Sequence, residues 1–261
     1  AAIVDRLRRE HSPLREVLGR APLMGVKTGD NGSFFLDVKR VRGASLETSD
    51  GFFIPLGAVC RCVRGRDTRR WKAAAKQWML WPPPNGWEKV PRWLERFAGA
   101  HRIDIGELKL RYVRAEHLGM KVVWKDLSRG LSAAVLGHSQ QIGGRAVPLI
   151  PNQTLYVLDA KSLDEARVIA ALMNSTIFGA LALCTAERAK DSYFRYFGRT
   201  IAAIPLPRVA RGSGDWCELV NLVRRSASSE IDAVVAALYG VSPEEHEVLA
   251  QFVARRLGFN D

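Results

Sequence analysis

Residues 151–176 read PNQTLYVLDAKSLDEARVIAALMNST. Pro151-Asn152 is typical of a turn, and the apolar run that follows predicts a strand over Thr154–Leu158. Ser162 is followed three residues later by Glu165, which is the pattern of a capping box and predicts a helix through about Met173. The stretch therefore predicts a domain that mixes strands with helices.

The whole chain divides into three parts with different sequence patterns. From Leu23 to Pro207, short apolar runs such as Ser33–Val38 and Val147–Ile150 are separated by Gly, Pro and basic turns, which is typical of strands. Residues 1–22 predict one or two short helices interrupted at Pro13. After Pro207 the pattern becomes helical.

The C-terminal part predicts two helices. Ser242-Pro243-Glu244-Glu245 combines an N-cap serine, a proline at the first helical position and a glutamate at the third. Just upstream, apolar residues follow helical spacing, and Gly240 suits a left-handed turn between the helices. The apolar positions are Ile231, Val234, Val235 and Leu238. We therefore expect a mixed α/β (α+β) fold: a twisted, mostly antiparallel sheet with helices on one side and a C-terminal helical hairpin.

Composition is that of a folded globular chain, with 47% hydrophobic and 25% charged residues among 261. No run approaches the roughly 18–20 apolar residues of a membrane span, so we expect no membrane association. Cys60 and Cys62 stand two apart, which predicts buried thiols on one face of a strand rather than a zinc or redox site. No secretory leader is recognisable, and we expect a cytoplasmic protein.

Charge is unusual in amount and in distribution. Lys and Arg number 39 against 27 Asp and Glu, which gives a net charge of +12. Residues 61–129 hold seventeen Lys and Arg and seven Asp and Glu, hence +10 of that total, together with six of the seven tryptophans. A concentrated basic region indicates contact with nucleic-acid phosphates, and the alternative is a solvated basic face above a Trp-rich core.

Catalytic motifs are missing from the sequence. It contains neither a G-x-G-x-x-G loop after a strand nor a Walker loop, and the five histidines are scattered. Asp104 with Glu107-Leu108-Lys109 imitates the end of a metal-nuclease motif, but its carboxylates are too close in sequence to come from two strands. Pro82-Pro83-Pro84-Asn85 predicts a rigid surface turn. We expect the chain to be non-catalytic by itself.

Polar loops between strands are the features that point to binding. Gly25–Gly32 places Lys27, Thr28 and Asn31 in a glycine-framed turn before the strand Ser33–Leu36, where they are candidates for phosphate or base contacts. Val63–Trp71 carries an arginine cluster in which Asp67 is expected to orient an arginine. Asn152 lies in a third loop, and Arg195 lies in a fourth region that runs from Ala171 to Pro207.

In order, these segments resemble a known family. The sequence GVKTGDN…FF, then RGRD…RW, PNQTLYV, LMNS and IPLP resembles the target-recognition region of adenine-N6 DNA methyltransferases, the TaqI-like C-terminal specificity domain of restriction–modification and phage-defence enzymes. The resemblance extends from about Leu14 to Ala250. It includes the tail Ile231-Asp232…Leu238-Tyr239-Gly240, which is similar to the family's closing helical segment. The segment from Pro82 to Met120 matches no part of the pattern.

The resemblance implies that target recognition and catalysis lie in different domains of one polypeptide. Residues 1–22 would be a connector from an upstream catalytic domain, 23–207 the target-recognition domain, and 208–261 a helical segment. The catalytic domain of the same polypeptide would bind S-adenosylmethionine and methylate an adenine flipped out of the duplex. Because the chain starts at Ala1 without an initiator Met, we expect it to be a piece of such a polypeptide.

Double-stranded DNA is therefore the expected partner. Phosphate contacts are assigned to the basic side chains Arg64, Arg66, Arg69, Arg70, Lys72, Lys125 and Arg129. Base-edge contacts are assigned to Lys27, Thr28, Asn31, Gln140, Gln141 and Asn152, and Arg195 is a further DNA-binding candidate. Gln140 and Gln141 are expected in a Gly-bounded loop, where a solvated turn is the alternative.

Two other functions fit the same residues. A DNA specificity subunit of a multi-subunit restriction system also lacks an active site, although such subunits carry two recognition domains separated by long helices. A basic protein-interaction or regulatory domain would use the 61–129 region against an acidic partner, and shallow salt dependence would favour it. A free-standing nuclease ranks last because no credible metal site is recognisable.

Overall fold

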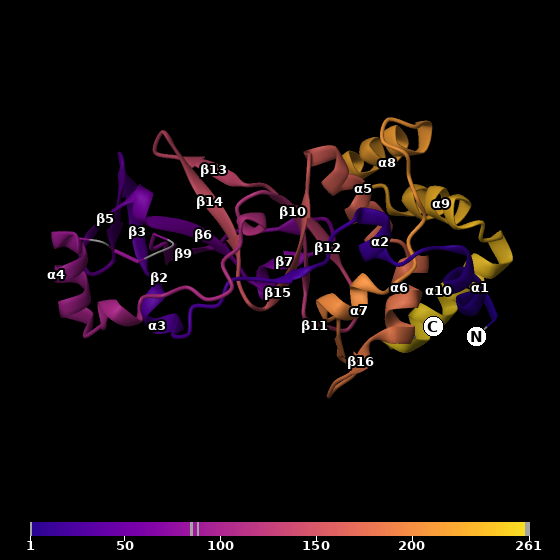
Figure 1. The fold of residues 1–261 in the computed structure, drawn as a ribbon, viewed down its shortest axis with the longest axis horizontal. Helices are drawn as coiled ribbons and strands as arrows, with labels where there is room; N and C mark the ends of the chain where they lie inside the picture. Colours follow the sequence, from indigo (N-terminus) through magenta and orange to yellow (C-terminus); the bar gives the residue numbers. More distant parts are fainter. Residues whose placement is uncertain (1, 84–85, 88, 259–261) are drawn as a thin grey trace.

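The computed structural model describes residues 2–83, 86–87 and 89–258 and has an elongated shape (Figure 1). A β-rich lobe lies at one end with helix α4 (Arg92–His101), a sheet lies in the middle, and a helical body that holds both chain ends lies at the other. The fold is mixed α/β with mostly antiparallel sheets and C-terminal helices, which confirms the predicted class.

The middle sheet joins the two ends of the molecule. Its strand order is β1-β15-β10-β12, and all its pairings are antiparallel. Along β10, Val122 and Trp124 face the core of the helical body, whereas Val123 faces a smaller cluster on the other side. Both faces of this sheet are therefore buried. The strands are β1 (Leu23–Met24), β10 (Met120–Lys125), β12 (Ala133–Leu136) and β15 (Leu155–Ala160).

Helices α5 and α6 form the centre of the helical body. The Ser162 hydroxyl accepts a hydrogen bond from Glu165 N at 3.1 Å and starts α5, as the sequence predicts. The Glu165 carboxylate, however, accepts from Lys161 N rather than from the cap residue. The helices of the body are α1 (Ala2–Glu10), α2 (Leu14–Leu18), α5 (Leu163–Met173), α6 (Thr176–Thr185), α7 (Gly198–Ala202), α8 (Gly214–Arg225), α9 (Ser228–Tyr239) and α10 (Pro243–Leu257).

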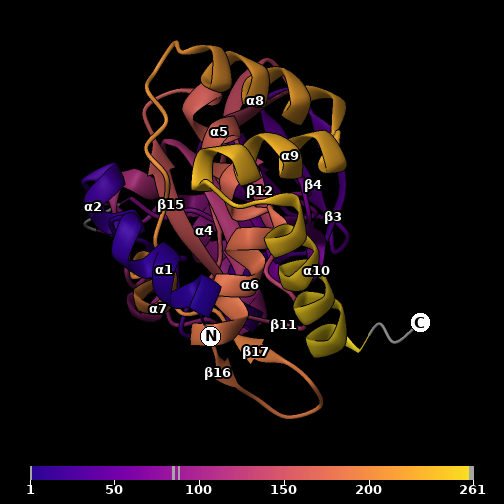
Figure 2. The ribbon, with the colours of Figure 1, turned by 90° about the vertical axis from the view of Figure 1, so that its right-hand side faces the viewer.

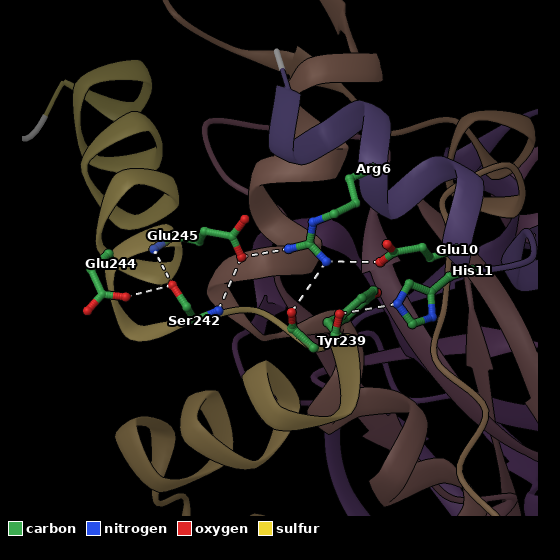
Figure 3. A network of polar contacts seen from close by, with 8 residues as sticks. Arg6, Glu10, His11, Tyr239, Ser242, Glu244 and Glu245 are labelled. Carbon is green, nitrogen blue, oxygen red and sulfur yellow. Dashed lines mark hydrogen bonds and ion pairs between the residues drawn. The ribbon is translucent and has the colours of Figure 1, made fainter.

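The last two helices occur as predicted, with the left-handed Gly240 between them and a complete capping box at Ser242. After the turn, α10 packs along α6 (Figure 2). The N-terminal helix joins them through Arg6, whose Nη2 lies 2.6 Å from Glu245 Oε2 and whose Nη1 lies 2.9 Å from Glu10 Oε2 (Figure 3). Both chain ends are thus fastened to one body.

The β-rich lobe is built on a second sheet, with strand order β13-β14-β6-β9-β2. Its pairings are antiparallel except that β14 runs parallel to β6. A separate sheet, β3-β4-β5, packs beside it. The strands are β2 (Phe35–Leu36), β3 (Val38–Arg42), β4 (Ser45–Thr48), β5 (Phe53–Pro55), β6 (Val59–Val63), β9 (Gln77–Leu80), β13 (Ser139–Ile142) and β14 (Arg145–Pro151).

The cysteines of β6 are buried as predicted. Cys60 and Cys62 point into the core of the lobe, and both are free thiols. Burial raises the pKa of the Cys62 thiol to about 12, and it also raises the pKa of the Cys60 thiol well above its ordinary value. Both thiols therefore stay protonated and behave as small apolar side chains.

Two local predictions are wrong. Ser33 and Phe34 belong to a short helix, α3 (Asn31–Phe34), because the Asp30 carboxylate accepts hydrogen bonds from Gly32 N and Ser33 N, each at 3.0 Å, and caps it. Gln140 and Gln141 lie in strand β13 rather than in a loop. The turn to β14 is made by consecutive left-handed glycines at 143 and 144, which is the geometry of a tight hairpin.

Two smaller β units lie near the junction of lobe and body. One is the hairpin of β7 (Thr68–Arg69) and β8 (Lys72–Ala73), and the other has the order β11-β17-β16. The latter comprises β11 (Leu127–Ser128), β16 (Glu187–Arg188) and β17 (Phe194–Arg195). The proline turn predicted at residues 82–85 lies partly outside the described residues.

Within the described residues, no single helix is long and apolar enough to cross a membrane. Helices α5 and α6 together meet the length and composition for one, but they are bent by 66° at their junction and most of their residues are buried.

Candidate nucleic-acid interface

A groove of about 810 Å³ opens at the junction of the β-rich lobe and the middle sheet. It collects segments that are far apart in the chain: the start of α3, the turn after β6, the end of β10, the β14–β15 turn and the β11–β17 pair. The groove is lined by Asn31, Arg64, Gly65, Arg66, Lys125, Asp126, Leu127, Asn152, Gln153, Thr154, Tyr193 and Arg195.

The floor of the groove is held by hydrogen bonds between two turns. Gly65 N donates to Thr154 Oγ1 at 2.8 Å, and that hydroxyl donates to Asn152 Oδ1 at 2.5 Å. A Cβ at position 65 would lie 3.2 Å from Thr154 O, so a larger residue would have to push the two turns apart by a few tenths of an ångström. The two basic residues that flank Gly65 are therefore held against the β14–β15 turn.

Positive charge dominates the lining. Arg64, Arg66, Lys125 and Arg195 provide the cations, and Asp126 is the one carboxylate among the described lining residues. The Arg64 guanidinium lies over the Phe35 ring, 3.8 Å from its centroid, which supports the side chain from below. Burial raises the pKa of Asp126, while Arg195, 3.3 Å away, acts in the opposite direction.

Several predicted DNA-contacting residues are brought together here. Those that line the groove are Asn31, Arg64, Arg66, Lys125, Asn152 and Arg195. Arg129 lies beside it, with its guanidinium 5.8 Å from the centroid of the Tyr193 ring. Asp67 was expected to orient an arginine, and its Oδ2 lies 3.8 Å from Arg66 Nε while Oδ1 lies 3.5 Å from Lys76 Nζ.

Two of the predicted base readers have their side chains turned inward. Thr28 is 5% exposed and its hydroxyl donates to Asn31 Oδ1 at 2.8 Å. Asn152 is 6% exposed, and its Oδ1 accepts from the backbone and the hydroxyl of Thr154. These polar groups stabilise the turns that carry their neighbours. Lys27 is half-buried, and its backbone pairs with that of Arg111.

The remaining basic candidates of the second loop lie away from the groove. Arg69 and Lys72 face each other across the β7–β8 hairpin, and both are exposed. At the tip, Arg70 Nη2 donates to Asn174 O at 2.5 Å and Trp71 N donates to Ala133 O at 2.9 Å, which fastens this hairpin to the helical body. Gln140 and Gln141 are exposed on β13, outside the groove lining.

Six of the twelve lining residues were not among the predicted contacts: Gly65, Asp126, Leu127, Gln153, Thr154 and Tyr193. Gln153 and Thr154 belong to the loop from which only Asn152 was chosen. Tyr193 stands two residues before Arg195, and this spacing would have placed both on one face of a strand. Leu127 carried no signal, because an isolated exposed leucine is ordinary.

The motifs examined for catalysis have structural roles in this part of the chain. The Asp104 carboxylate accepts a hydrogen bond from Gly106 N at 2.8 Å and caps the 3-10 turn Ile105–Glu107. Across the described residues, no group of three His, Cys, Asp or Glu side chains is arranged to hold a metal ion.

Comparison with known proteins gives one kind of match. No family model and no curated protein sequence matches the chain. Among solved structures, the fold is similar to part of the Type IIL restriction–modification enzyme MmeI, whose structure was determined in complex with DNA. The TM-score is 0.53 at 12% identity, and the match covers 92% of this chain and 35% of that one. The chain spans about a third of MmeI and shares the fold of that part of a restriction–modification enzyme.

Proposed function

We propose that this chain binds double-stranded DNA in a sequence-specific way, as the recognition module of a restriction–modification enzyme. The observation that carries the proposal is the groove of about 810 Å³, in which four cations from three separate segments lie among amide and hydroxyl side chains. The fold likeness to part of the DNA-bound MmeI supports it.

The chemistry of the groove suits a duplex. Arginine and lysine neutralise phosphates and fix the register, whereas amides donate to and accept from base edges. Asn31 is exposed, and Gln153 is half-buried in the β14–β15 turn, whose Thr154 accepts hydrogen bonds from Gly65 N and from Asp126 N. We assign phosphate contacts to Arg66 and Lys125, and base-edge contacts to Asn31 and Gln153.

The parent protein, in our proposal, is an adenine-N6 DNA methyltransferase of the restriction–modification or phage-defence type that acts in the cytoplasm. The order of motifs from GVKTGDN to IPLP supports this assignment. The catalytic domain of the same polypeptide would bind S-adenosylmethionine and methylate a flipped adenine. This chain would be non-catalytic by itself and would hold that domain in register on its site.

The proposal is tested by removing groove cations one at a time. Arg66→Ala and Lys125→Ala should each weaken binding to duplexes of every sequence by a similar factor, and should lower the salt slope of log K by about one. Binding is measured by fluorescence anisotropy with labelled random-sequence duplexes between 50 and 300 mM NaCl. Arg255→Ala is the matched control, because Arg255 is exposed on α10 in the helical body.

The outcomes separate the candidate functions. If the groove variants bind duplex DNA as tightly as the control and the unmodified protein do, the groove does not contact DNA. Preference for an acidic polypeptide over duplex DNA at equal charge would support the protein-interaction function instead.

A further inference from the structure

The small sheet β11-β17-β16 presents one side to the groove. In its antiparallel register Leu127 pairs with Arg195 and Ser128 pairs with Phe194. Continued by one step, the same register places Arg129 opposite Tyr193, which agrees with the 5.8 Å between the Arg129 guanidinium and the Tyr193 ring. Because side chains alternate along a strand, Leu127, Arg129, Tyr193 and Arg195 share one face, and the exposed Glu187 of β16, which pairs with Arg195, lies on the same face.

This face is exposed and chemically mixed, unlike the opposite one. Leu127 is 43% and Tyr193 38% exposed, and each is paired with an arginine across the strands. On the opposite face, Phe194 and Ser128 are buried. Two exposed apolar side chains, each set beside a guanidinium, form a surface that matches neither a solvated face nor a core.

The hairpin of β16 and β17 projects from the helical body (Figures 1 and 2). Its tip is a turn in which Tyr193 N donates to Lys190 O at 3.2 Å and in which Asp191 and Ser192 both have positive φ, 57° and 60°. Two consecutive left-handed residues give the turn that matches the twist of a tight two-stranded ribbon. The ribbon is therefore narrow and protruding.

The root of the ribbon is rigidly tied to the groove. Asp126 N donates to Thr154 O at 3.1 Å, and Asp126 O accepts from Tyr196 N at 2.7 Å. The Tyr196 hydroxyl donates to Arg129 O at 3.0 Å, and the Asp126 carboxylate holds Arg195 at 3.3 Å. The exposed face is consequently preorganised before any ligand arrives.

We propose that this face is a second base-reading element of the module, beside Asn31 and Gln153: the β16–β17 ribbon, flanked by β11, enters the major groove of the duplex, where Leu127 and Tyr193 contact thymine methyl groups and Arg129 and Arg195 contact guanine. The inference rests on the proposed duplex binding and adds this ribbon to Asn31 and Gln153 as a source of its sequence specificity.

The physical fit favours DNA as the occupant. The major groove, about 12 Å wide, admits a two-stranded ribbon, and it displays the thymine methyl as its apolar group and guanine N7 and O6 as paired acceptors. On one face of the strands, an apolar side chain suits the thymine methyl and an arginine suits guanine N7 and O6. The positive charge of the adjoining groove complements the phosphates that flank it.

The test uses base analogues that remove one feature at a time. Duplexes are first enriched from a randomised pool with the unmodified protein. Thymines of the enriched site are then replaced one by one by deoxyuridine, which lacks the methyl, and guanines by 7-deazaguanine, which lacks N7. Dissociation constants are measured for the protein, for Leu127→Ala and Tyr193→Ala, and for Arg129→Ala and Arg195→Ala.

We expect each base analogue to weaken binding only when the side chain that contacts that base is present. At a thymine contacted by Leu127, deoxyuridine should weaken the unmodified protein about fourfold, the equivalent of one buried methyl group, and should leave Leu127→Ala unaffected. Arg195→Ala should lose at least about fivefold at one guanine and become insensitive to 7-deazaguanine there. Val248→Ala, an exposed apolar truncation on α10, is the control and should keep the full response to both analogues.

Two results would overturn the inference. One is full sensitivity to every analogue in all four ribbon variants, and the other is a uniform loss over all sequences, which means phosphate contact only. Failure of the unmodified protein to enrich any duplex would instead contradict the proposed function. Thermal unfolding of each variant identifies any loss caused by misfolding.

Discussion

The most unusual single residue is Lys121 on β10. Its side chain is fully buried, and Nζ donates to Gly119 O at 2.5 Å and to Gly137 O at 3.1 Å. No carboxylate forms an ion pair with it in the described part of the chain. Burial lowers the pKa of Lys121 to about 7, because the ammonium group loses its hydration.

This burial makes stability depend on pH. Below about pH 7 the lysine is charged in both states and the folded state bears the cost of burying the charge. Between about pH 7 and 10.5 the folded lysine is neutral while the unfolded one still binds a proton, so the free energy of unfolding rises with pH. We expect a rise on the order of a few kcal/mol across this window.

The measurement is urea unfolding at intervals from pH 7 to 9.5. Lys121→Met should flatten the rise, because methionine fills a similar volume without a titrating group. Lys39→Met changes a lysine whose side chain is 59% exposed and should leave the pH profile unaltered. A profile for Lys121→Met as steep as that of the unmodified protein would place the titrating group elsewhere.

At the scale of elements, the turn at the tip of the β16–β17 hairpin stores strain. Left-handed backbone costs an L-residue roughly 1–2 kcal/mol, and Asp191 and Ser192 both adopt it. Ser192→Gly should therefore raise the free energy of unfolding by up to about 1 kcal/mol, which is a gain of roughly 2 °C in Tm for a chain of this size. Calorimetry checks it.

The control for this substitution is the same change at a cap. Ser213 has φ −66° and its side chain accepts a hydrogen bond from Trp216 N at 3.2 Å, so Ser213→Gly should lower stability by a few tenths of a kcal/mol. If both substitutions shift Tm in the same direction, the strain at the hairpin tip does not govern its stability.

The elements that the sequence predicts well are those with local signals. Ser162 and Ser242 cap α5 and α10 because the hydroxyl, the following backbone N–H groups and the acidic third residue all lie within one turn. Asp30 carries an equally local capping signal, and it outweighs the apolar pattern that predicted residues 33–34 in a strand. The strand at Gln140 depends on the left-handed Gly143-Gly144 turn, which pairs β13 with β14.

The motifs behind the family resemblance hold the body together, which local patterns do not reveal. Both the Asn174 amide nitrogen and its oxygen bond the backbone of Ala133, and so join the end of α5 to β12. Asp232 accepts from the backbone and hydroxyl of Thr176, and the Tyr239 hydroxyl donates to Pro205 O at 2.8 Å. Each bonding partner is more than thirty residues away in the chain. The sequence motifs therefore identified these residues as part of the resemblance but did not reveal which contacts they make.

For the whole molecule, the sequence predicts an excess of positive charge but not how the fold distributes it. The cations of residues 61–129 separate: Arg64, Arg66 and Lys125 line the groove, Arg92 and Arg96 lie on α4 at the far end of the lobe, and Lys121 is buried. The groove also gains Arg195 from outside this region. The basic region is therefore not one surface.

This distribution fixes the salt dependence of binding. Each neutralised phosphate of B-DNA contributes about −0.9 to the slope of log K against log salt. The groove cations that are not assigned to guanine, Arg64, Arg66 and Lys125, should thus give a slope of about −2.7, whereas the full charge of residues 61–129 would give about −9. The slope is measured by anisotropy with a 20-base-pair duplex in NaCl. A value near −9 would require α4, at the far end of the lobe, and the β7–β8 hairpin, in the middle of the molecule, to reach the same duplex, and their separation opposes this (Figure 1). A value near zero would mean that phosphates are not bound at all.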